Sequence, residues 1–371
     1  MTTLPKLDLC DLTREELRAF VVGLGAPAFR GDQVFRWLWK RGAALLPAPF
    51  DAMTDLPAGF RAQLAEAATI RRVEAARIDV SKDGTRKFLV RLADGREVES
   101  VLIPEESRMT LCISSQVGCA LACAFCATGT MGLLRNLTPG EIAGQVSLAV
   151  EELRARPHPG HPDRERPITS LVYMGMGEPL HNYDHVLTSL RILTDDQGLD
   201  FAPRRITVST VGLVPQMAAL GEAIAVNLAV SLHAPNDRVR GSIMPVNKRY
   251  SLTDVIDACR AFPLGTRRRI TFEYVLLHGV NDRPEHADEL ANLVRDLRCK
   301  VNVIPWNEHP GANFRRPFEA TSRAFAERLR ELGVDTTIRM TRGRDIDAAC
   351  GQLALAAPRA GGGAAAPTTR S

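Results

Sequence analysis

The stretch that decides the fold is residues 109–141, MTLCISSQVGCALACAFCATGTMGLLRNLTPGE. Its first six residues are mostly apolar and predict a strand buried on both faces. Its last four residues place Thr138 before Pro139 and Glu141 at the third helical position, which predicts a capped helix running to about Leu153. Three cysteines lie between the predicted strand and the predicted helix. The stretch therefore predicts one β/α unit with a cysteine-bearing connection.

The same alternation of strand and helix continues toward the C-terminus. Short runs rich in β-branched residues predict further strands at 168–174, 206–209, 225–232, 270–277, 301–304 and 336–340. Helices are expected between them, one opened by Ser251 and Asp254 and one closed by Gly333. Alternating strands and helices predict a parallel sheet. The pattern alone does not separate an open sheet from a barrel.

The first part of the chain has a different pattern. Helices are predicted at 15–24, 29–40 and 57–68, and Thr13 and Glu16 form a capping box for the first of them. Alternating runs follow at 73–80, 85–92 and 96–103, separated by two Asp-Gly pairs that are typical of hairpin turns.

These patterns divide the chain into four parts. We expect a helical N-terminal domain over 1–68, an antiparallel β-ribbon over 69–104 and an α/β core over 105–353. Residues 354–371 are mostly Ala, Gly, Pro and Thr without periodicity, so we expect a disordered tail there.

Composition sets limits on the function. A chain of 371 residues buries a large core, so a metal site would serve function rather than folding. The net charge of +4 does not decide for or against a nucleic-acid partner, although several Arg clusters are compatible with a phosphate-rich substrate. No signal peptide or membrane span is apparent, so we expect a cytoplasmic protein that does not bind membranes. Its eight cysteines are then candidates for metal or redox chemistry.

Cys119, Cys123 and Cys126 form a Cys-x3-Cys-x2-Cys motif. Three thiolates can hold three irons of a 4Fe-4S cluster and leave the fourth iron open for S-adenosylmethionine. A zinc site would need a fourth ligand from a second Cys or His pair, and a ferredoxin-type cluster would need another cysteine before Cys259. The spacing, together with Phe125, resembles the radical S-adenosylmethionine superfamily. The resemblance implies a 4Fe-4S cluster that cleaves S-adenosylmethionine to a radical.

Polar residues that could bind this cofactor follow the predicted strands. Gly177 and Glu178 lie in a glycine-rich turn after the second strand, and the resemblance implies that this turn holds the methionine amino group. The other candidates at the carboxyl ends of strands, where sites in parallel α/β folds assemble, are Ser209, Ser231, Leu232, His233 and Asn307. A plain tight turn at Gly177 and a loop histidine satisfied by its neighbours at His233 are the alternatives.

Two thiols outside the motif have polar surroundings in the sequence. Cys112 lies on the strand before the cysteine loop, and Cys350 follows the last predicted strand. Simple packing is the alternative for both, and we expect packing for Cys10, Cys259 and Cys299.

Several segments together resemble the bacterial dual-specificity RNA methyltransferases, which methylate adenine carbon 2 in 23S rRNA and in some tRNAs. The segments are 99–104, 112–119, 174–179, 231–233 and 345–353. The resemblance runs from about residue 13 to residue 353, and FRGDQVFRW at 29–37 is similar to an RNA-contacting accessory domain. It implies an α/β fold with a partial (β/α)6 barrel, a small N-terminal helical domain and a short antiparallel ribbon.

The resemblance also implies roles for individual residues. Cys350 takes a methyl group from one S-adenosylmethionine, and a radical from a second one activates that methyl group for addition to the base. Cys112 then resolves the adduct by forming a transient disulfide with Cys350. Glu99 is the proton acceptor, although the residues alone favour an exposed strand carboxylate there.

Partners follow from the same resemblance. They are 23S rRNA, tRNA and an electron donor such as flavodoxin with its reductase, acting on a monomer. The target adenine is expected to be flipped out of its stack or single-stranded.

Three rival functions stay open. A sister enzyme methylates adenine carbon 8 and confers antibiotic resistance, although the N-terminal segment and the sequence around Cys350 favour carbon 2. A non-methylating radical enzyme, such as a glycyl-radical activase, would not need Cys350. A cluster-bearing RNA-binding regulator would not cleave S-adenosylmethionine.

Overall fold

The computed structural model describes residues 6–40, 50–161, 165–266, 268–309, 311–339 and 341–353. The tail expected over 354–371 lies outside these residues, as do residues 1–5 and 41–49 of the expected N-terminal domain. Residue 340, the last of the strand expected at 336–340, also lies outside them.

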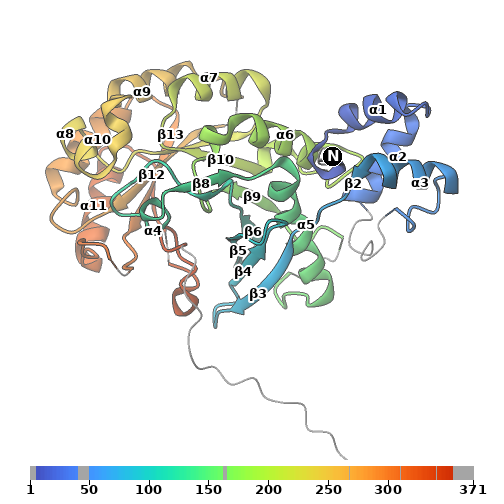
Figure 1. The fold of residues 1–371 in the computed structure, drawn as a ribbon. Helices are drawn as coiled ribbons and strands as arrows, with labels where there is room; N and C mark the ends of the chain where they lie inside the picture. The colour runs from blue at the N-terminus through green and yellow to red at the C-terminus, as the bar shows by residue number, and fades with distance from the viewer. Residues whose placement is uncertain are drawn as a thin grey trace, which may run out of the picture.

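A single ten-stranded sheet forms the centre of the molecule (Figure 1). Seven of its strands within the described residues pair in parallel, in the order of the chain. They are β6 (Arg108–Cys112), β9 (Ser170–Tyr173), β10 (Ile206–Thr210), β11 (Asn227–Ser231), β12 (Ile270–Leu276), β13 (Cys299–Pro305) and β14 (Thr336–Ile338). The predicted parallel sheet is confirmed.

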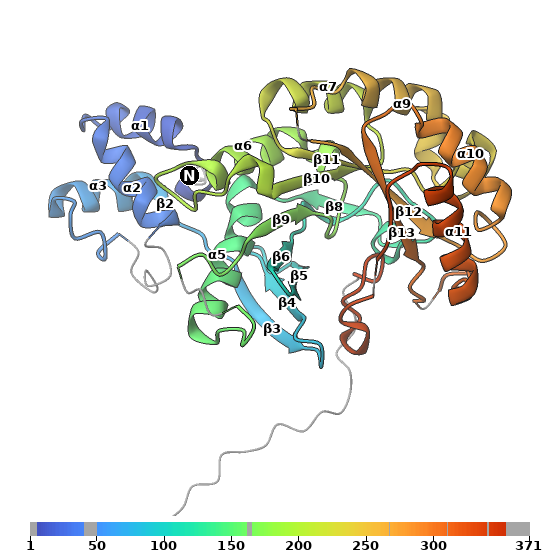
Figure 2. The same cartoon turned by 180° about the vertical axis from the view of Figure 1, so that it is seen from behind.

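Helices connect these strands and cover the outer side of the curved sheet, as Figures 1 and 2 show. They are α5 (Pro139–Ala155), α6 (Tyr183–Thr194), α7 (Val214–Ala223), α9 (Leu252–Ala261), α10 (Pro284–Val294) and α11 (Glu319–Glu331). A shorter helix, α8 (Asp237–Ile243), precedes α9. Six β/α units therefore precede β14, and the sheet does not close, since β14 and β3 are its edges. This is a partial barrel, as expected.

The local signals for helix ends are confirmed by backbone geometry. Capping boxes begin α1 (Arg14–Gly23), α5 and α9, with Thr13, Thr138 and Ser251 as the N-caps. Gly333 ends α11 with a positive φ of 83°, a conformation that costs other residues energy. These short-range signals depend on neighbouring residues only, so the sequence shows them directly.

The predicted β-ribbon forms, but it is not a separate unit. Its strands are β3 (Glu74–Val80), β4 (Arg86–Arg91) and β5 (Glu97–Glu105). β5 pairs antiparallel with β6 and brings Val101 opposite Cys112, so the ribbon extends the core sheet. This places Glu99 on the strand next to the one that carries Cys112.

The N-terminal elements pack against one flank of the barrel, beside α5 and α6 (Figure 2). They are β1 (Leu7–Asp8), a 3-10 turn (Leu9–Asp11), α1 (Arg14–Gly23), α2 (Phe29–Trp39), α3 (Ala58–Ala67) and β2 (Ala68–Thr69). The Asp11 carboxylate accepts a hydrogen bond from the Gly140 amide at 2.9 Å, at the start of α5. Arg14 pairs with Asp195 at 3.0 Å, at the end of α6. Side chains of these helices, including Phe35, join the same apolar core as the sheet.

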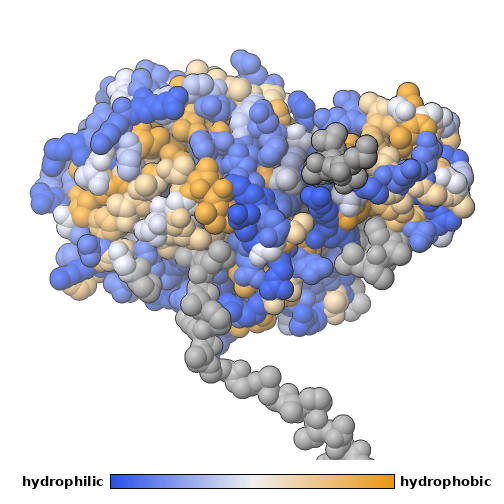
Figure 3. Space-filling view, viewed as in Figure 1, coloured by the Kyte–Doolittle hydropathy of each residue, from blue (hydrophilic) through white to orange (hydrophobic). Residues whose placement is uncertain are grey.

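The surface seen in Figure 3 is mostly polar. An apolar area lies over β8 (Leu133–Asn136), where Leu134 is 60% exposed. No helix in the described part of the chain combines the length and apolar character needed to cross a membrane.

Candidate active site

A cavity of about 920 Å³, including its opening to solvent, lies at the carboxyl ends of the parallel strands. This is the edge at which the polar candidates were expected to meet. The predicted site residues that line it are Cys119, Cys123, Cys126, Gly177, Glu178, Ser209, Ser231, His233, Asn307 and Cys350. Leu232 does not line it, because its side chain is fully buried in the core. Cys112 and Glu99 lie outside its lining as well.

The cysteine loop is closed by a small hairpin that the sequence did not predict. Strand β7 (Gln116–Gly118) precedes the cysteine loop, and β8 follows the loop and the short helix α4 (Ala127–Thr130). The two strands pair antiparallel with each other. The Cys119 amide donates to the Gly132 carbonyl at 2.9 Å, and a Cβ on Gly118 would lie 1.8 Å from that oxygen. The two glycines therefore allow the ends of the loop to meet.

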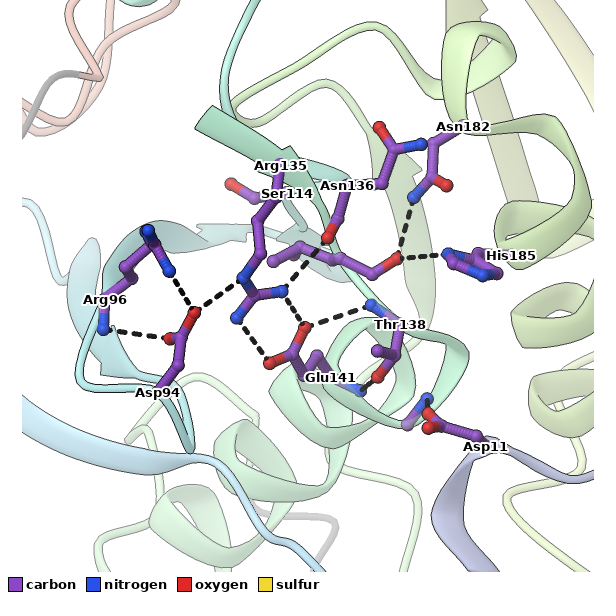
Figure 4. A network of polar contacts seen from close by, with 12 residues as sticks. Asp11, Asp94, Arg96, Ser114, Arg135, Asn136, Thr138, Glu141, Asn182 and His185 are labelled. Carbon is purple, nitrogen blue, oxygen red and sulfur yellow. Dashed lines mark hydrogen bonds and ion pairs between the residues drawn. The ribbon is translucent and has the colours of Figure 1, made fainter. Parts of the chain in front are cut away.

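Arg135 anchors the returning strand β8, as Figure 4 shows. Its guanidinium donates to both oxygens of Glu141 at 2.7 and 2.8 Å and to Asp94 at 2.7 Å. The hydrogen bond and charge of Arg135 hold the pKa of Asp94 well below its usual range. β8 is thereby tied to the N-terminus of α5 and to the turn between β4 and β5.

The three loop thiols lie in a setting that disfavours thiolates without a bound cation. Burial raises the pKa of Cys119 to about 11 and also raises the pKa values of Cys123 and Cys126. All three line the cavity, yet among the described residues no three His, Cys, Asp or Glu side chains group closely enough for a single metal ion. Three thiols around a cavity suit a cluster that offers each of them its own iron.

The turn after β9 is held by tight backbone packing. Gly177 has a φ of 101°, and a Cβ there would lie 2.5 Å from the Cβ of Gln116. The Glu178 carboxylate accepts hydrogen bonds from the amides of Leu180 at 3.1 Å and Val211 at 2.9 Å. Burial raises the pKa of Glu178 to about 7 despite these bonds. The Thr210 side chain also hydrogen-bonds to this carboxylate, which has about four acceptor positions and therefore keeps capacity to accept from a ligand.

His233 is both satisfied by its neighbours and part of the cavity wall. Its Nδ1 accepts from the Val275 amide at 3.0 Å, and its ring meets the Phe125 ring edge-on at 4.8 Å. Burial, and then the charge of Arg240, lower the pKa of His233 to about 3, so the ring is neutral. The alternative of a satisfied loop histidine is therefore confirmed without removing His233 from the site.

Cys350 reaches the cavity on a segment without regular structure. The Asn307 amide donates to the Cys350 carbonyl at 3.2 Å. Cys112 is buried on β6, and both cysteines are free thiols in this structure. Burial, and then the nearby Cys350 thiol, raise the pKa of Cys112 to about 12.

Glu99 is buried, so the expectation of an exposed strand carboxylate is wrong. Its Oε1 lies 3.1 Å from Nζ of Lys87, which is buried as well. The alternating pattern of β5 predicted that Glu99 is exposed, because alternation is typical of a strand with one face toward solvent. Both faces are covered in the structure, since the ribbon belongs to the core sheet.

Sequence reasoning missed two charged residues in the cavity, Glu273 and Arg339. Glu273 lies inside the apolar strand β12, and its Oε1 accepts from the Asn302 amide at 2.9 Å. The Cys350 thiol and then Glu273 raise the pKa of Arg339, despite its burial. A lone acidic residue within an apolar strand was the available signal for Glu273.

The packing expected for the remaining cysteines agrees with their surroundings. Cys10 and Cys259 are buried, and Cys299 is half-buried on β13, away from the cavity.

Comparison with known proteins shows the class of enzyme to which the chain belongs. Residues 113–294 match the family model described as the radical SAM superfamily. Residues 7–70 match the model of the ribosomal RNA large subunit methyltransferase N-terminal domain. A crystal structure of a radical SAM methyltransferase from Sphaerobacter thermophilus superposes with a TM-score of 0.85 at 46% identity, covering 94% of this chain and 99% of that one. The fold and site therefore define a radical SAM methyltransferase.

Curated relatives identify the particular family. The dual-specificity RNA methyltransferase RlmN of Syntrophotalea carbinolica is 48% identical, over 94% of this chain and 90% of its own length. The RlmN protein of Geobacter sulfurreducens is 50% identical, over 94% of this chain and 92% of its own. The chain belongs to the RlmN family of dual-specificity RNA methyltransferases.

Proposed function

We propose that this enzyme methylates carbon 2 of an adenine in 23S rRNA and of an adenine in tRNA, with Cys350 as the carrier of the methyl group. The observation that carries the proposal is the position of Cys350. It lines one cavity with the three loop thiols, and Cys350 lies close enough to the proposed resolving thiol Cys112 to contribute to the raised pKa of Cys112.

The described residues fit the cofactors of the superfamily. Cys119, Cys123 and Cys126 would hold a 4Fe-4S cluster, and the cavity beside them would hold S-adenosylmethionine. Gly177 and Glu178 would receive its ammonium group. The remaining contacts would come from Ser209, Ser231, Leu232 through its backbone, His233 and Asn307. When bound, the cluster and cofactor supply a 5′-deoxyadenosyl radical.

Cys350 and Cys112 would act as a pair of thiols. Cys350 sulfur would attack the methyl group of a first S-adenosylmethionine and become S-methylcysteine, as the methyl–sulfonium bond breaks and S-adenosylhomocysteine leaves. The second S-adenosylmethionine of the turnover would serve to activate that methyl group. Arg339 lines the same cavity as Cys350. Once the carbon is joined to the base, Cys112 sulfur attacks Cys350 sulfur. A disulfide forms, the bond from Cys350 sulfur to carbon breaks with its electron pair passing to the base, the methylene carbon takes up a proton, and the methylated base leaves.

Glu99 would accept the proton from adenine carbon 2. Its carboxylate is buried, and the Lys87 ammonium at 3.1 Å compensates its charge there. A base held this way has little freedom to turn away from its target.

The division of labour along the chain is part of the proposal. Residues 1–68 would contact RNA, residues 69–104 would form the ribbon that carries Glu99, and residues 105–353 would form the catalytic core. We further propose a cytoplasmic monomer that receives electrons from a donor such as flavodoxin.

Mapping the methylated carbon tests the proposal. Cluster-loaded enzyme, a reductant, S-adenosylmethionine and 23S rRNA fragments or tRNA should yield 2-methyladenosine in nucleoside mass spectra. A yield of 8-methyladenosine would support the sister activity instead. 5′-Deoxyadenosine without methylated RNA, unchanged in Cys350→Ala, would support a non-methylating enzyme. The matched control is Cys299→Ala, a thiol outside the cavity.

A further inference from the structure

The geometry points to a latch that holds Cys350 in place: the turn between β3 and β4 clamps the segment 341–353, with Asp83 and Asp345 as positioning residues. This inference rests on the proposed function, in which Cys350 carries the methyl group. Nothing in the sequence pattern joins the two segments, because Ser81 and Asp345 are 264 residues apart.

The latch consists of two carboxylates, one on each segment, and each accepts hydrogen bonds from the other segment. Asp83, in the turn, accepts a hydrogen bond from the Gly343 amide at 3.0 Å. Asp345, in the Cys350 segment, accepts from the Ser81 hydroxyl at 2.5 Å and from the Lys82 amide at 3.2 Å. Hydrogen bonds to ionised groups are stronger than neutral ones, and reciprocal bonds resist rotation of one segment on the other.

The carboxylates stay ionised over the range in which the enzyme could work. Burial would raise the pKa of Asp83, but hydrogen bonds from Gly343 and Thr85 outweigh it and lower that pKa to about 2. The hydrogen bond from Ser81, followed by that from Lys82, lowers the pKa of Asp345. The latch is thus a fixed clamp and does not open with moderate changes of pH.

Lys87 links the latched segment to the proposed base. Its Nζ lies 3.4 Å from the Asp347 carbonyl oxygen and 3.1 Å from Glu99 Oε1. The strand β4 therefore contacts both the segment that carries Cys350 and the carboxylate that would take the proton. Positions of Cys350 and Glu99 are coupled through one buried ammonium group.

The other end of the segment is held by the cysteine loop. The Ala127 amide donates to the Gly351 carbonyl at 2.9 Å, and the Thr128 hydroxyl donates to the Leu353 carbonyl. Together with the bond from Asn307, these contacts fix the residues just after Cys350. Cys350 thus lies between two anchoring points, and the latch is the one that belongs to the ribbon.

The backbone of the segment depends on these contacts. Within it the only regular element among the described residues is a three-residue 3-10 turn, Arg344–Ile346. Gly343 has a φ of 61°, and a Cβ there would lie 2.8 Å from the Ala348 Cβ and 3.0 Å from Thr85 Cγ2. Asp347 has a φ of 52°, which a non-glycine residue adopts at a cost. The hydrogen bonds within the segment, such as the bond from the Ala348 amide to the Gly343 carbonyl at 3.0 Å, form short turns, and the clamp adds contacts to a distant part of the chain.

Hydrogen exchange on cluster-loaded protein tests the latch independently of activity. In the double variant Asp83→Ala/Asp345→Ala we expect peptides covering 343–353 to exchange about tenfold faster than in the wild type. Asp79→Ala is the matched control, since Asp79 lies on the same hairpin and pairs with Arg77. The control should exchange like the wild type, and peptides from β10 to β12 should be unchanged in all variants.

Reaction products separate positioning from general damage. We expect RNA methylation by the double variant to fall on the order of tenfold to a hundredfold, because small displacements of a reacting group are costly. Its 5′-deoxyadenosine formation should stay within about twofold of the wild type, since neither Asp83 nor Asp345 lines the cofactor cavity. Unchanged exchange over 343–353, or equal losses of both products, would overturn the latch. Wild-type enzyme that produces no methylated adenine would overturn the proposed function, while the exchange result would still decide the latch.

Discussion

Nζ of Lys87 lies 3.1 Å from Oε1 of Glu99, and both side chains are buried on neighbouring strands of the ribbon. A buried ion pair contributes little when intact, but removal of one partner leaves an uncompensated charge. We therefore expect Lys87→Met to lower the free energy of unfolding by about 3 kcal/mol, measured by urea denaturation. The double variant Lys87→Met/Glu99→Gln should recover most of this loss. If Lys87→Met were as stable as the wild type, the Lys87 ammonium would not be needed to compensate the charge of Glu99.

Cys112→Ala should trap the enzyme on its RNA. Cys112 is the buried thiol beside Cys350, so its removal leaves the bond between Cys350 and the base unbroken in the proposed scheme. A covalent protein–RNA species should appear on denaturing gels with Cys112→Ala and be absent with Cys350→Ala. Multiple turnovers by Cys112→Ala would remove Cys112 from the mechanism, and Cys299→Ala provides the comparison for loss of an unrelated thiol.

Cofactor affinity should depend on pH through Glu178. Burial raises its pKa from 4.5 to about 7, so at pH 6 most of the folded protein holds a neutral carboxyl. Since the ionised form attracts an ammonium group, binding of S-adenosylmethionine should tighten as the pH rises from 6 to 8. Titration calorimetry on cluster-loaded protein measures this, and Glu178→Gln should bind more weakly and lose that pH dependence.

The Glu178 carboxyl should also affect the stability of the fold, which a rise in pH should lower. Because the pKa of Glu178 is higher in the folded state than its ordinary 4.5, the contribution to stability is complete below pH 4.5 and is lost as the pH rises through about 7. Cofactor-free Glu178→Gln should therefore gain stability relative to the wild type between pH 6 and 8. A constant difference between the two proteins over this range would contradict the raised pKa.

Arg240 should be essential for the loop that carries Leu232 and His233. It is fully buried and donates to the carbonyls of Val211 at 2.6 Å and Leu232 at 3.3 Å. Arg240→Ala leaves these oxygens without a donor, so we expect a loss of about 3 kcal/mol in urea denaturation. Arg238→Ala, an exposed position on the same helix, should change stability by less than about 0.5 kcal/mol. Similar effects of both substitutions would show that the buried hydrogen bonds of Arg240 are unimportant.

The parts of the fold that sequence reasoning predicted depend on neighbouring residues. Capping residues such as Thr138 act within one helical turn, and strands such as β12 are rich in β-branched and aromatic residues. The parallel order then follows from the connections between them. The three-residue strand β7 escaped prediction because it is too short to show a period, and pairing of β5 with β6 depends on distant residues.

Some residues of the site could likewise be predicted from the sequence, and others could not. Cys119, Glu178 and Asn307 could be placed because each follows a predicted strand, and parallel strands end at one edge. The burial of Glu99, the presence of Arg339 in the cavity and the bond between Ser81 and Asp345 could not be predicted. Each depends on tertiary packing of segments far apart in the chain, for which a single sequence has no local signal.

The most direct test of the account is the mass spectrum of the Cys350 peptide. Cluster-loaded wild-type protein would be incubated with methyl-labelled S-adenosylmethionine and a reductant, without RNA, and then digested. We expect one labelled methyl group on Cys350 and none on Cys112. An unlabelled Cys350 in protein that demonstrably cleaves S-adenosylmethionine would contradict it.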